Sequence, residues 1–216
     1  MLSFGWSLAL GLALLVCQRS RTPARILCLG DSMTASSYGS YPRDVAELCR
    51  QKGLRADVIS AARPGNTSGE FLRHFKKKQL LLKKQPHIVL LMLGTNDVRI
   101  DGDHTEAADF SANIQALIDR LLRHTNRDGS KPRVFLATIP PIFNTEFATY
   151  DGRSRERIES EINPAIRRLA VANRIALVDI HRVFVGHPEL LPGIHPTAAG
   201  YRRMAEAFLG AIEPFL

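Results

Sequence analysis

The sequence predicts an α/β domain in which helices cover both faces of a parallel, five-stranded sheet. Two observations support this fold class. Short apolar runs without polar interruption, such as Ile26-Leu27-Cys28-Leu29, are typical of strands buried on both faces. They alternate with longer segments in which apolar residues recur every three or four positions, as in amphipathic helices. Strands that alternate with helices favour a three-layer α/β/α arrangement.

The first half of the chain supplies three strands. A strand at 26–29 leads through a polar loop at 34–40 into a helix at about 42–52, where Pro42 suits the first turn and Gly53 the end. The second strand, at 56–60, precedes a loop in which Thr67 or Ser68 can cap the next helix. Residues 87–93 are the most apolar stretch and are expected to form the third strand.

The second half supplies the other two strands. A helix at about 106–124 and a turn at 126–131 precede the fourth strand, at 133–139. After a loop at 143–152, helical periodicity over 158–169 is interrupted at Pro164, and Asn163 can cap a second piece. The fifth strand is expected at 175–180, followed by a loop at 182–194 and a final helix that opens after His195-Pro196-Thr197.

Length and composition fit one domain, expected at 23–216, after an apolar leader at 1–22. Hydrophobic residues at 45% and charged residues at 23% exclude general disorder. The formal net charge is +8, and the basic residues at 76–78 and 83–84 are interpreted as a solvated helix face. Attraction to anionic polysaccharide, phospholipid or nucleic acid is the alternative. No RNA- or DNA-binding fingerprint accompanies these residues, so no nucleic-acid partner is expected.

The leader is apolar from Leu8 to Cys17, and Arg19 and Arg21 follow it rather than precede it. It resembles a signal-peptide core or a membrane anchor. We therefore expect a secreted, periplasmic or membrane-anchored protein that associates with a membrane through this segment; an unprocessed cytoplasmic protein is the alternative. The cysteines lack a metal-ligand spacing, and Cys28 and Cys49 are expected to be buried free thiols.

Polar residues that could carry out chemistry follow the predicted strands. Ser32 comes directly after the first strand, at the edge where open α/β sheets bind ligands, and is the candidate nucleophile. A serine nucleophile needs a base and donors for an oxyanion. His195 is the candidate base, and the N–H groups of Ser32 and Gly65 with the amide of Asn96 are candidate donors. Taken singly, each residue also fits an ordinary turn; their order after successive strands favours a site.

The segments Gly30-Asp31-Ser32, Pro64-Gly65-Asn66-Thr67, Gly94-Thr95-Asn96-Asp97 and His195-Pro196 resemble the four sequence blocks of the SGNH (GDSL-like) hydrolase family. They occur in the family's order and cover the chain from about residue 25 to its C-terminus. The resemblance implies a flavodoxin-like sheet and esterase chemistry that needs no metal or other cofactor. It also implies that Ser32 is the nucleophile, that His195 is the base, and that Ser32, Gly65 and Asn96 form the oxyanion hole.

One position departs from the family pattern. The family usually carries Asp three residues before the histidine, and here that residue is Pro192. Three explanations stay open: Glu189 orients His195, a backbone carbonyl accepts the His195 Nδ1–H in a Ser–His dyad, or activity is lost or slow. Asp179 is expected to be structural, and His181 and His187 are weaker candidates for the base.

The expected function is hydrolysis of a small acyl ester, such as an O-acetyl group on a carbohydrate, through an acyl-Ser32 intermediate. A lysophospholipase-like lipid esterase is the second choice. A non-catalytic carbohydrate- or lipid-binding protein is the rival that the missing Asp favours. A nucleotide-binding protein is less favoured because no glycine-rich phosphate loop follows the first strand. Loops 34–40, 143–152 and 182–194 are expected to line the pocket with Tyr38, Phe143, Phe147, Tyr150 and Phe184.

Overall fold

The computed structural model describes residues 22–77, 79–102, 104–144 and 149–216. Its centre is a five-stranded sheet in the order β4-β1-β5-β6-β7, and every neighbouring pair is parallel. The strands are β1 (Ala24–Gly30), β4 (Ala56–Ala62), β5 (Ile88–Met92), β6 (Arg133–Ala137) and β7 (Ala176–Val178). The predicted sheet is confirmed.

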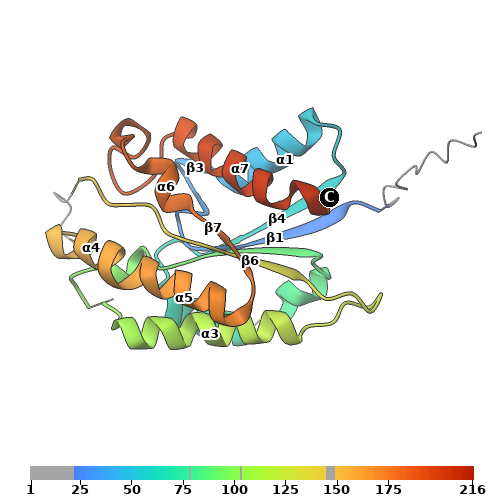
Figure 1. The fold of residues 1–216 in the computed structure, drawn as a ribbon, viewed down its shortest axis with the longest axis horizontal. Coiled ribbons are helices and arrows are strands. Elements are labelled where there is room, and N and C mark those ends of the chain that lie inside the picture. Colours follow the sequence, from blue (N-terminus) through green and yellow to red (C-terminus); the bar gives the residue numbers. More distant parts are fainter. Residues whose placement is uncertain (1–21, 78, 103, 145–148) are drawn as a thin grey trace, which may run out of the picture.

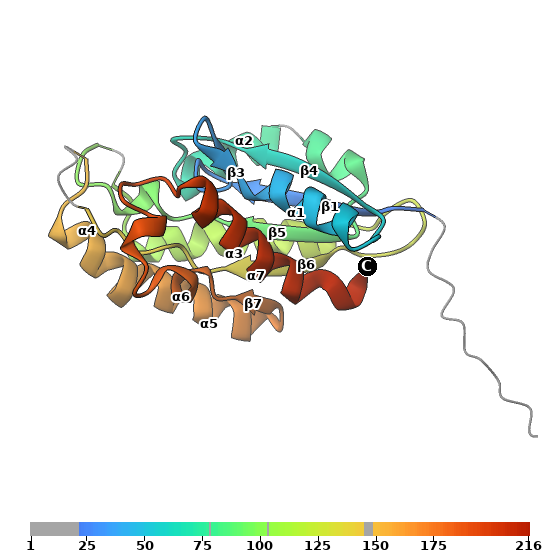
Figure 2. The ribbon, with the colours of Figure 1, turned by 90° about the horizontal axis from the view of Figure 1, so that it is seen from above.

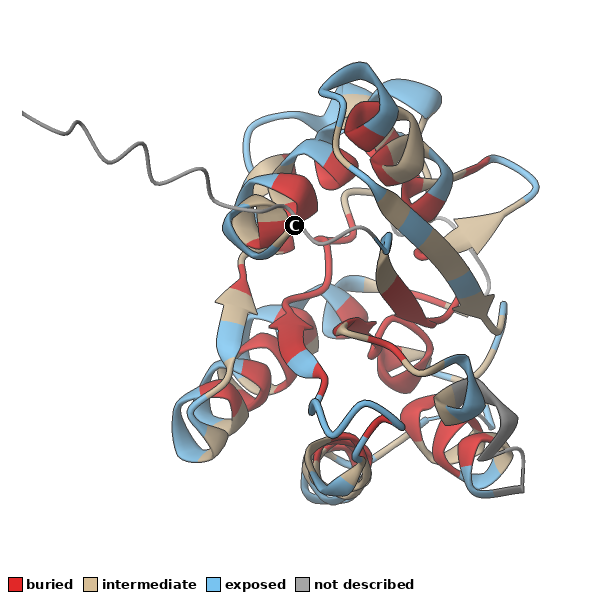
Figure 3. Cartoon of the chain, turned by 90° about the vertical axis from the view of Figure 1, so that its right-hand side faces the viewer, coloured by how far each residue is buried: buried red, intermediate tan, exposed pale blue. Residues whose placement is uncertain are grey.

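Helices cover both faces of the sheet (Figures 1 and 2). One layer holds α1 (Tyr41–Gln51) and α7 (Ala198–Ile212), which pack against each other. The opposite layer holds α3 (Ala107–Arg123) between α2 (Ser68–Lys77) and α5 (Asn163–Asn173). The buried residues face one another between these layers, as Figure 3 shows. Every residue of β5 is buried, which explains why this strand has no polar alternation.

The structure differs from the predicted elements at three places. The predicted loop at 34–40 contains a short antiparallel hairpin, β2 (Ala35–Ser36) and β3 (Gly39–Ser40). The fifth strand ends at Val178, and a short helix, α6 (Ile180–Phe184), follows it. Helical structure runs without a break from α4 (Gly152–Arg157) through a π-helical turn (Ile158–Ile162) into α5.

Pro164 therefore does not divide the helix, because it falls in the first turn of α5, directly after the π-helical turn. Asn163 does not cap a second piece either. Its side chain instead accepts from the Ile139 N–H at 2.9 Å and donates to the Ile139 carbonyl at 3.0 Å. It thereby ties α5 to the loop that follows β6.

The leader and Phe147 lie outside the described residues. Cys28 and Cys49 are buried free thiols, as predicted. No helix in the described part of the chain combines the length and the apolar character needed to cross a membrane.

Gly30, the last residue of β1, is expected to tolerate no side chain. A Cβ atom there would collide with the Thr34 side chain and the Met92 carbonyl. We expect Gly30→Ala to lower the free energy of unfolding by about 1–3 kcal/mol, the usual cost of overpacking, measured by urea denaturation. Gly210→Ala is the control because nothing lies within 4 Å of its Cβ position on α7. An equal effect of both substitutions would contradict this reading.

Candidate active site

Three neighbouring strands place the loops of the candidate site side by side. β1 lies between β4 and β5 in the sheet. Ser32 follows the end of β1, Gly65 the end of β4 and Asn96 the end of β5, each within four residues. Because parallel strands end at the same edge, these three residues belong to one edge of the sheet.

The turn that carries Ser32 is held from inside by Asp31. The Asp31 carboxylate accepts the Met33 N–H at 2.8 Å, and its carbonyl accepts the Thr34 N–H at 3.1 Å. Burial, with a smaller contribution from the neighbouring Asp97 carboxylate, raises the pKa of Asp31 to about 7. Among the described residues the Ser32 N–H has no hydrogen-bond acceptor, so this donor is available at the turn.

The Asn96 amide is fixed at both of its ends. Its Nδ2 donates to the Asn66 carbonyl at 2.9 Å, and its Oδ1 accepts from the Tyr150 hydroxyl at 3.2 Å. The second Nδ2–H is then free to bind a ligand. Next to Asn66, Gly65 has a φ of +80°, a left-handed conformation that suits glycine. Within the described residues the Gly65 N–H also has no acceptor.

A buried carboxylate ties the loops after β4 and β5 together. Asp97 accepts from the Ser68 N–H at 2.9 Å and from the Ser68 hydroxyl at 2.6 Å. Burial raises the pKa of Asp97, while the bonds from Ser68 oppose that rise. Thr67 caps α2, as predicted for Thr67 or Ser68: it exchanges hydrogen bonds with Glu70 at 3.0 and 3.3 Å. The backbone of residues 65–68 is thus held against Asn96.

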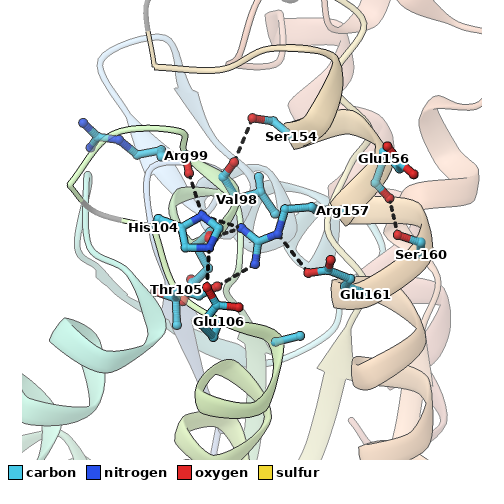
Figure 4. A network of polar contacts seen from close by, with 12 residues as sticks. Val98, Arg99, His104, Thr105, Glu106, Ser154, Glu156, Arg157, Ser160 and Glu161 are labelled. Carbon is cyan, nitrogen blue, oxygen red and sulfur yellow. Dashed lines mark hydrogen bonds and ion pairs between the residues drawn. The ribbon is translucent and has the colours of Figure 1, made fainter.

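Arg157, the last residue of α4, supports the loop after β5 that carries Asn96 and Asp97 (Figure 4). Its guanidinium donates to the carbonyls of Asp97 at 3.0 Å and Thr105 at 2.6 Å, and pairs with Glu161 at 2.8 Å. One turn earlier, the Ser154 hydroxyl donates to the Val98 carbonyl at 2.7 Å. Two side chains from α4 therefore hold the main chain just after Asn96.

His195 lies in the loop that leads into α7, close to the turn that carries Ser32. Thr197 caps α7 by accepting the Gly200 N–H at 3.2 Å. One turn further on, the Tyr201 hydroxyl donates to the Ser32 carbonyl at 3.0 Å. The beginning of α7 is thereby joined to the Ser32 turn, and His195 shares the edge that carries Ser32.

The His195 ring stacks on Tyr38, with ring centroids 5.0 Å apart and planes 16° apart. Tyr38 lies at the tip of the β2–β3 hairpin, which is fastened to α7 by a bond of 3.0 Å between Ser36 Oγ and the Tyr201 hydroxyl. Partial burial lowers the pKa of His195, which keeps the imidazole neutral at neutral pH. A neutral imidazole is the form that can accept a proton.

The structure does not bring Glu189 to His195. The Glu189 carboxylate is exposed and pairs with His187 at 3.0 Å. Among the described residues no hydrogen bond joins His195 to Ser32, to any carboxylate or to any backbone carbonyl, so the carbonyl expected to accept its Nδ1–H is not found. Asp179 caps α6 and pairs with Arg167 at 2.9 Å, in keeping with the structural role expected of it.

The aromatic residues expected to line a pocket have different roles. Phe184 is fully buried in the core, so its assignment to a pocket wall is wrong. Phe143 packs partly buried against the core, and Tyr38 is 67% exposed. Sequence reasoning also missed the polar contacts of Tyr201, Tyr150 and Arg157. A tyrosine within an apolar helical stripe, as at Tyr201, is a weak sequence signal of such a contact. No pattern in the sequence marks the contacts of Arg157.

In the described part of the chain no group of three His, Cys, Asp or Glu residues could hold a metal ion. The fold and the site define a class: a three-layer α/β protein with a serine, a histidine and several uncovered donors at the carboxyl edge of its sheet. The family model of the GDSL-like Lipase/Acylhydrolase family matches residues 28–203. The chain belongs to this family.

Two curated relatives are esterases. A multidomain esterase of Ruminococcus flavefaciens is 30% identical over 159 residues, which is 71% of this chain and 19% of that protein. An acetylxylan esterase of Xylanibacter ruminicola is 25% identical over 213 residues, 88% of this chain and 43% of that protein. The chain thus spans less than half the length of either relative. A lipase/acylhydrolase structure from Enterococcus faecalis has the same fold, with a TM-score of 0.74 and 22% identity over 89% of this chain and 97% of that one.

Proposed function

We propose that the protein is a serine esterase that hydrolyses a small acyl ester through an acyl-Ser32 intermediate. The observation that carries this proposal is the junction of the loops after β1, β4 and β5. Ser32, the Gly65 N–H and the fixed Asn96 amide each follow one of these three neighbouring strands. These donors suit the negative oxygen of a tetrahedral intermediate.

In the proposed mechanism, His195 Nε2 takes the Ser32 hydroxyl proton as Oγ attacks the ester carbonyl. The Ser32 and Gly65 N–H groups and the Asn96 Nδ2 stabilise the oxyanion. The intermediate then collapses, and His195 returns the proton to the leaving alcohol. Water attacks the acyl-enzyme with His195 as base again, which releases the carboxylic acid and restores Ser32.

Of the three explanations left open by Pro192 we favour a Ser–His dyad, but one in which the Tyr38 ring, and not a backbone carbonyl, contacts the imidazole of His195. Glu189 pairs with His187, and the stacked Tyr38 ring is the aromatic contact of His195. In this proposal the Tyr38 ring and the cap of α7 limit the orientation of the imidazole, which is the task that a carboxylate has in a triad.

For the natural substrate we propose an O-acetyl group on a carbohydrate. Support comes from the acetylxylan esterase of Xylanibacter ruminicola, to which the chain is similar over 88% of its length. This choice is tested by comparing two rates: the release of acetate from acetylated xylooligosaccharides and the release of fatty acid from short-chain lysophospholipids. Faster hydrolysis of the lipid ester would overturn it.

Glu189→Gln is expected to leave turnover of p-nitrophenyl acetate within about twofold of the original chain, because the carboxylate contacts His187. An organophosphonate ester should in the same samples label Ser32 stoichiometrically, as read from the mass of the Ser32 peptide. Failure of the unsubstituted chain to turn over the ester or to be labelled would favour a non-catalytic binding protein. Loss of turnover in folded Glu189→Gln would indicate a triad.

Tyr38→Ala is expected to lower kcat by about threefold to tenfold, since an aromatic stacking pair contributes about 0.5–1.5 kcal/mol. Tyr38→Phe keeps the ring and should restore most of the rate. Steady-state kinetics on p-nitrophenyl acetate distinguish the two variants. If Tyr38→Phe is as slow as Tyr38→Ala, the hydroxyl of Tyr38 rather than its stacked ring supports the rate.

A further inference from the structure

The end of the molecule opposite the candidate active site is strongly basic. It is formed by the turns that lead into the strands and by the last turn of α3, and we call it the basic end. Besides Lys52, which pairs with Glu213, and the half-buried Arg25, this end carries nine cationic side chains, all exposed except for the half-buried Arg120. They are Arg55, Lys83, Lys84, Arg120, Arg123, Arg127, Lys131, Arg133 and Arg174.

Within the described residues none of these nine side chains forms an ion pair with a carboxylate. The acidic side chains Asp57, Asp128 and Glu213 also lie at this end, and two of them already have partners. Asp128 lies 3.7 Å from His87, and Glu213 lies 2.8 Å from Lys52. Near the opposite end, by contrast, arginines have carboxylate partners, as in Arg153–Asp151 and Arg157–Glu161. The positive charge of these nine side chains is therefore not compensated by ion pairs.

Apolar groups lie among these charges. Phe215 is 44% exposed, and the Arg133 guanidinium lies over its ring at 4.0 Å from the centroid. A hollow between α2 and α3 has Phe75 and Leu82 in its wall together with Arg120, Arg123 and His124. Cationic heads beside an accessible aromatic ring suit an interface between anionic headgroups and acyl chains.

The chain enters the described structure at this same end. Thr22 lines a hollow with Arg55 and Phe215, and the C-terminus lies close by (Figure 1). The sequence before Thr22 holds the apolar run from Leu8 to Cys17 and then Arg19 and Arg21. In proteins that bind an anionic bilayer, an apolar segment enters the acyl chains and the basic residues next to it bind the anionic headgroups. The order of residues before Thr22, followed by the basic end, fits this arrangement.

We propose that the basic end docks on the surface of an anionic lipid bilayer. The strands run from this end to the edge that carries Ser32, so docking directs the candidate active site away from the lipid and toward soluble substrate. Binding should depend on anionic lipid and weaken with salt, because the Debye length is about 10 Å at 0.1 M salt.

The test uses the full chain and sedimentation with vesicles of phosphatidylcholine, alone or with about a third of phosphatidylglycerol. One variant carries Lys83→Gln, Lys84→Gln, Arg123→Gln and Arg127→Gln. Its matched control carries Arg43→Gln, Arg168→Gln, Arg202→Gln and Arg203→Gln, which remove the same charge from α1, α5 and α7. Thermal melting followed by circular dichroism confirms that both variants fold.

We expect the first variant to lose about tenfold or more of its affinity for anionic vesicles, and the control to stay within about twofold of the original chain. Vesicles of phosphatidylcholine alone should bind all three proteins equally, which separates the charge effect from any contribution of the leader. Equal losses in both variants, or no preference for anionic lipid, would overturn the proposal. So would a loss of binding to duplex DNA or heparin in the first variant while its vesicle binding is unchanged.

Discussion

Ser32→Ala is expected to lower kcat for p-nitrophenyl acetate by roughly 10⁴- to 10⁶-fold, leaving only the residual catalysis that binding and the oxyanion donors supply. The substitution removes the only atom that can form the acyl-enzyme in the proposed mechanism. It should leave the fold intact, because the recorded hydrogen bond of Ser32 uses its carbonyl, which Tyr201 binds, and not its hydroxyl. The measurement is the initial rate at saturating ester, with folding checked by circular dichroism.

Ser160→Ala is the control for this prediction, since Ser160 lies exposed on the π-helical turn and, among the described residues, its hydroxyl bonds only to the Glu156 carbonyl. Its rate should equal that of the unsubstituted chain. The organophosphonate label should disappear from Ser32→Ala and persist in Ser160→Ala. Equal turnover by the two variants would mean that Ser32 is not the nucleophile.

The parts of the fold that could be predicted are those with a strong local pattern. Residues 26–29 of β1 and all of β5 are uninterrupted apolar runs because they are buried on both faces, and the amphipathic helices follow from a regular spacing. The hairpin at 35–40 escaped prediction because each of its strands has only two residues, too few for any alternation to show. The helix α6 was not predicted because its five residues are too few to show a helical periodicity.

The loops of the candidate site could also be located from the sequence, because Ser32, Gly65 and Asn96 each follow a strand of a parallel sheet. Their supports could not. The Tyr201 hydroxyl binds the Ser32 carbonyl across 169 positions of sequence, and no periodicity encodes such a contact. For Glu189 the sequence suggested a contact with His195 that the described part of the structure does not contain. Glu189 pairs with His187 instead, because of the three-dimensional course of the loop.

Arg157 illustrates how a distant helix can matter for the site. It binds the Asp97 and Thr105 carbonyls, and so holds the loop that carries Asn96. Together with the Asp97–Ser68 bonds, it makes the donors at this edge part of one hydrogen-bonded frame. Donors fixed before the reaction need no reorganisation when the oxyanion forms.

His195→Ala is expected to lower kcat roughly 10⁴- to 10⁶-fold, as for Ser32→Ala, because the two residues act as a unit. His187→Ala is the matched control: His187 is exposed, is also followed by proline and pairs with Glu189, and its loss should leave the rate unchanged. A loss of activity in His187→Ala with retention in His195→Ala would reverse the assignment of the base.

The pH profile of the unsubstituted chain distinguishes a dyad from a triad. The base must be neutral to accept a proton, so kcat/KM should rise with pH through the pKa of His195 and then level off. Burial lowers that pKa below its ordinary value of 6.5, and no carboxylate of the described residues opposes the shift. The midpoint should therefore lie below 6.5 and stay in place in Glu189→Gln. A carboxylate facing His195 would favour the imidazolium form, so a midpoint above the ordinary value that falls in Glu189→Gln would contradict the dyad.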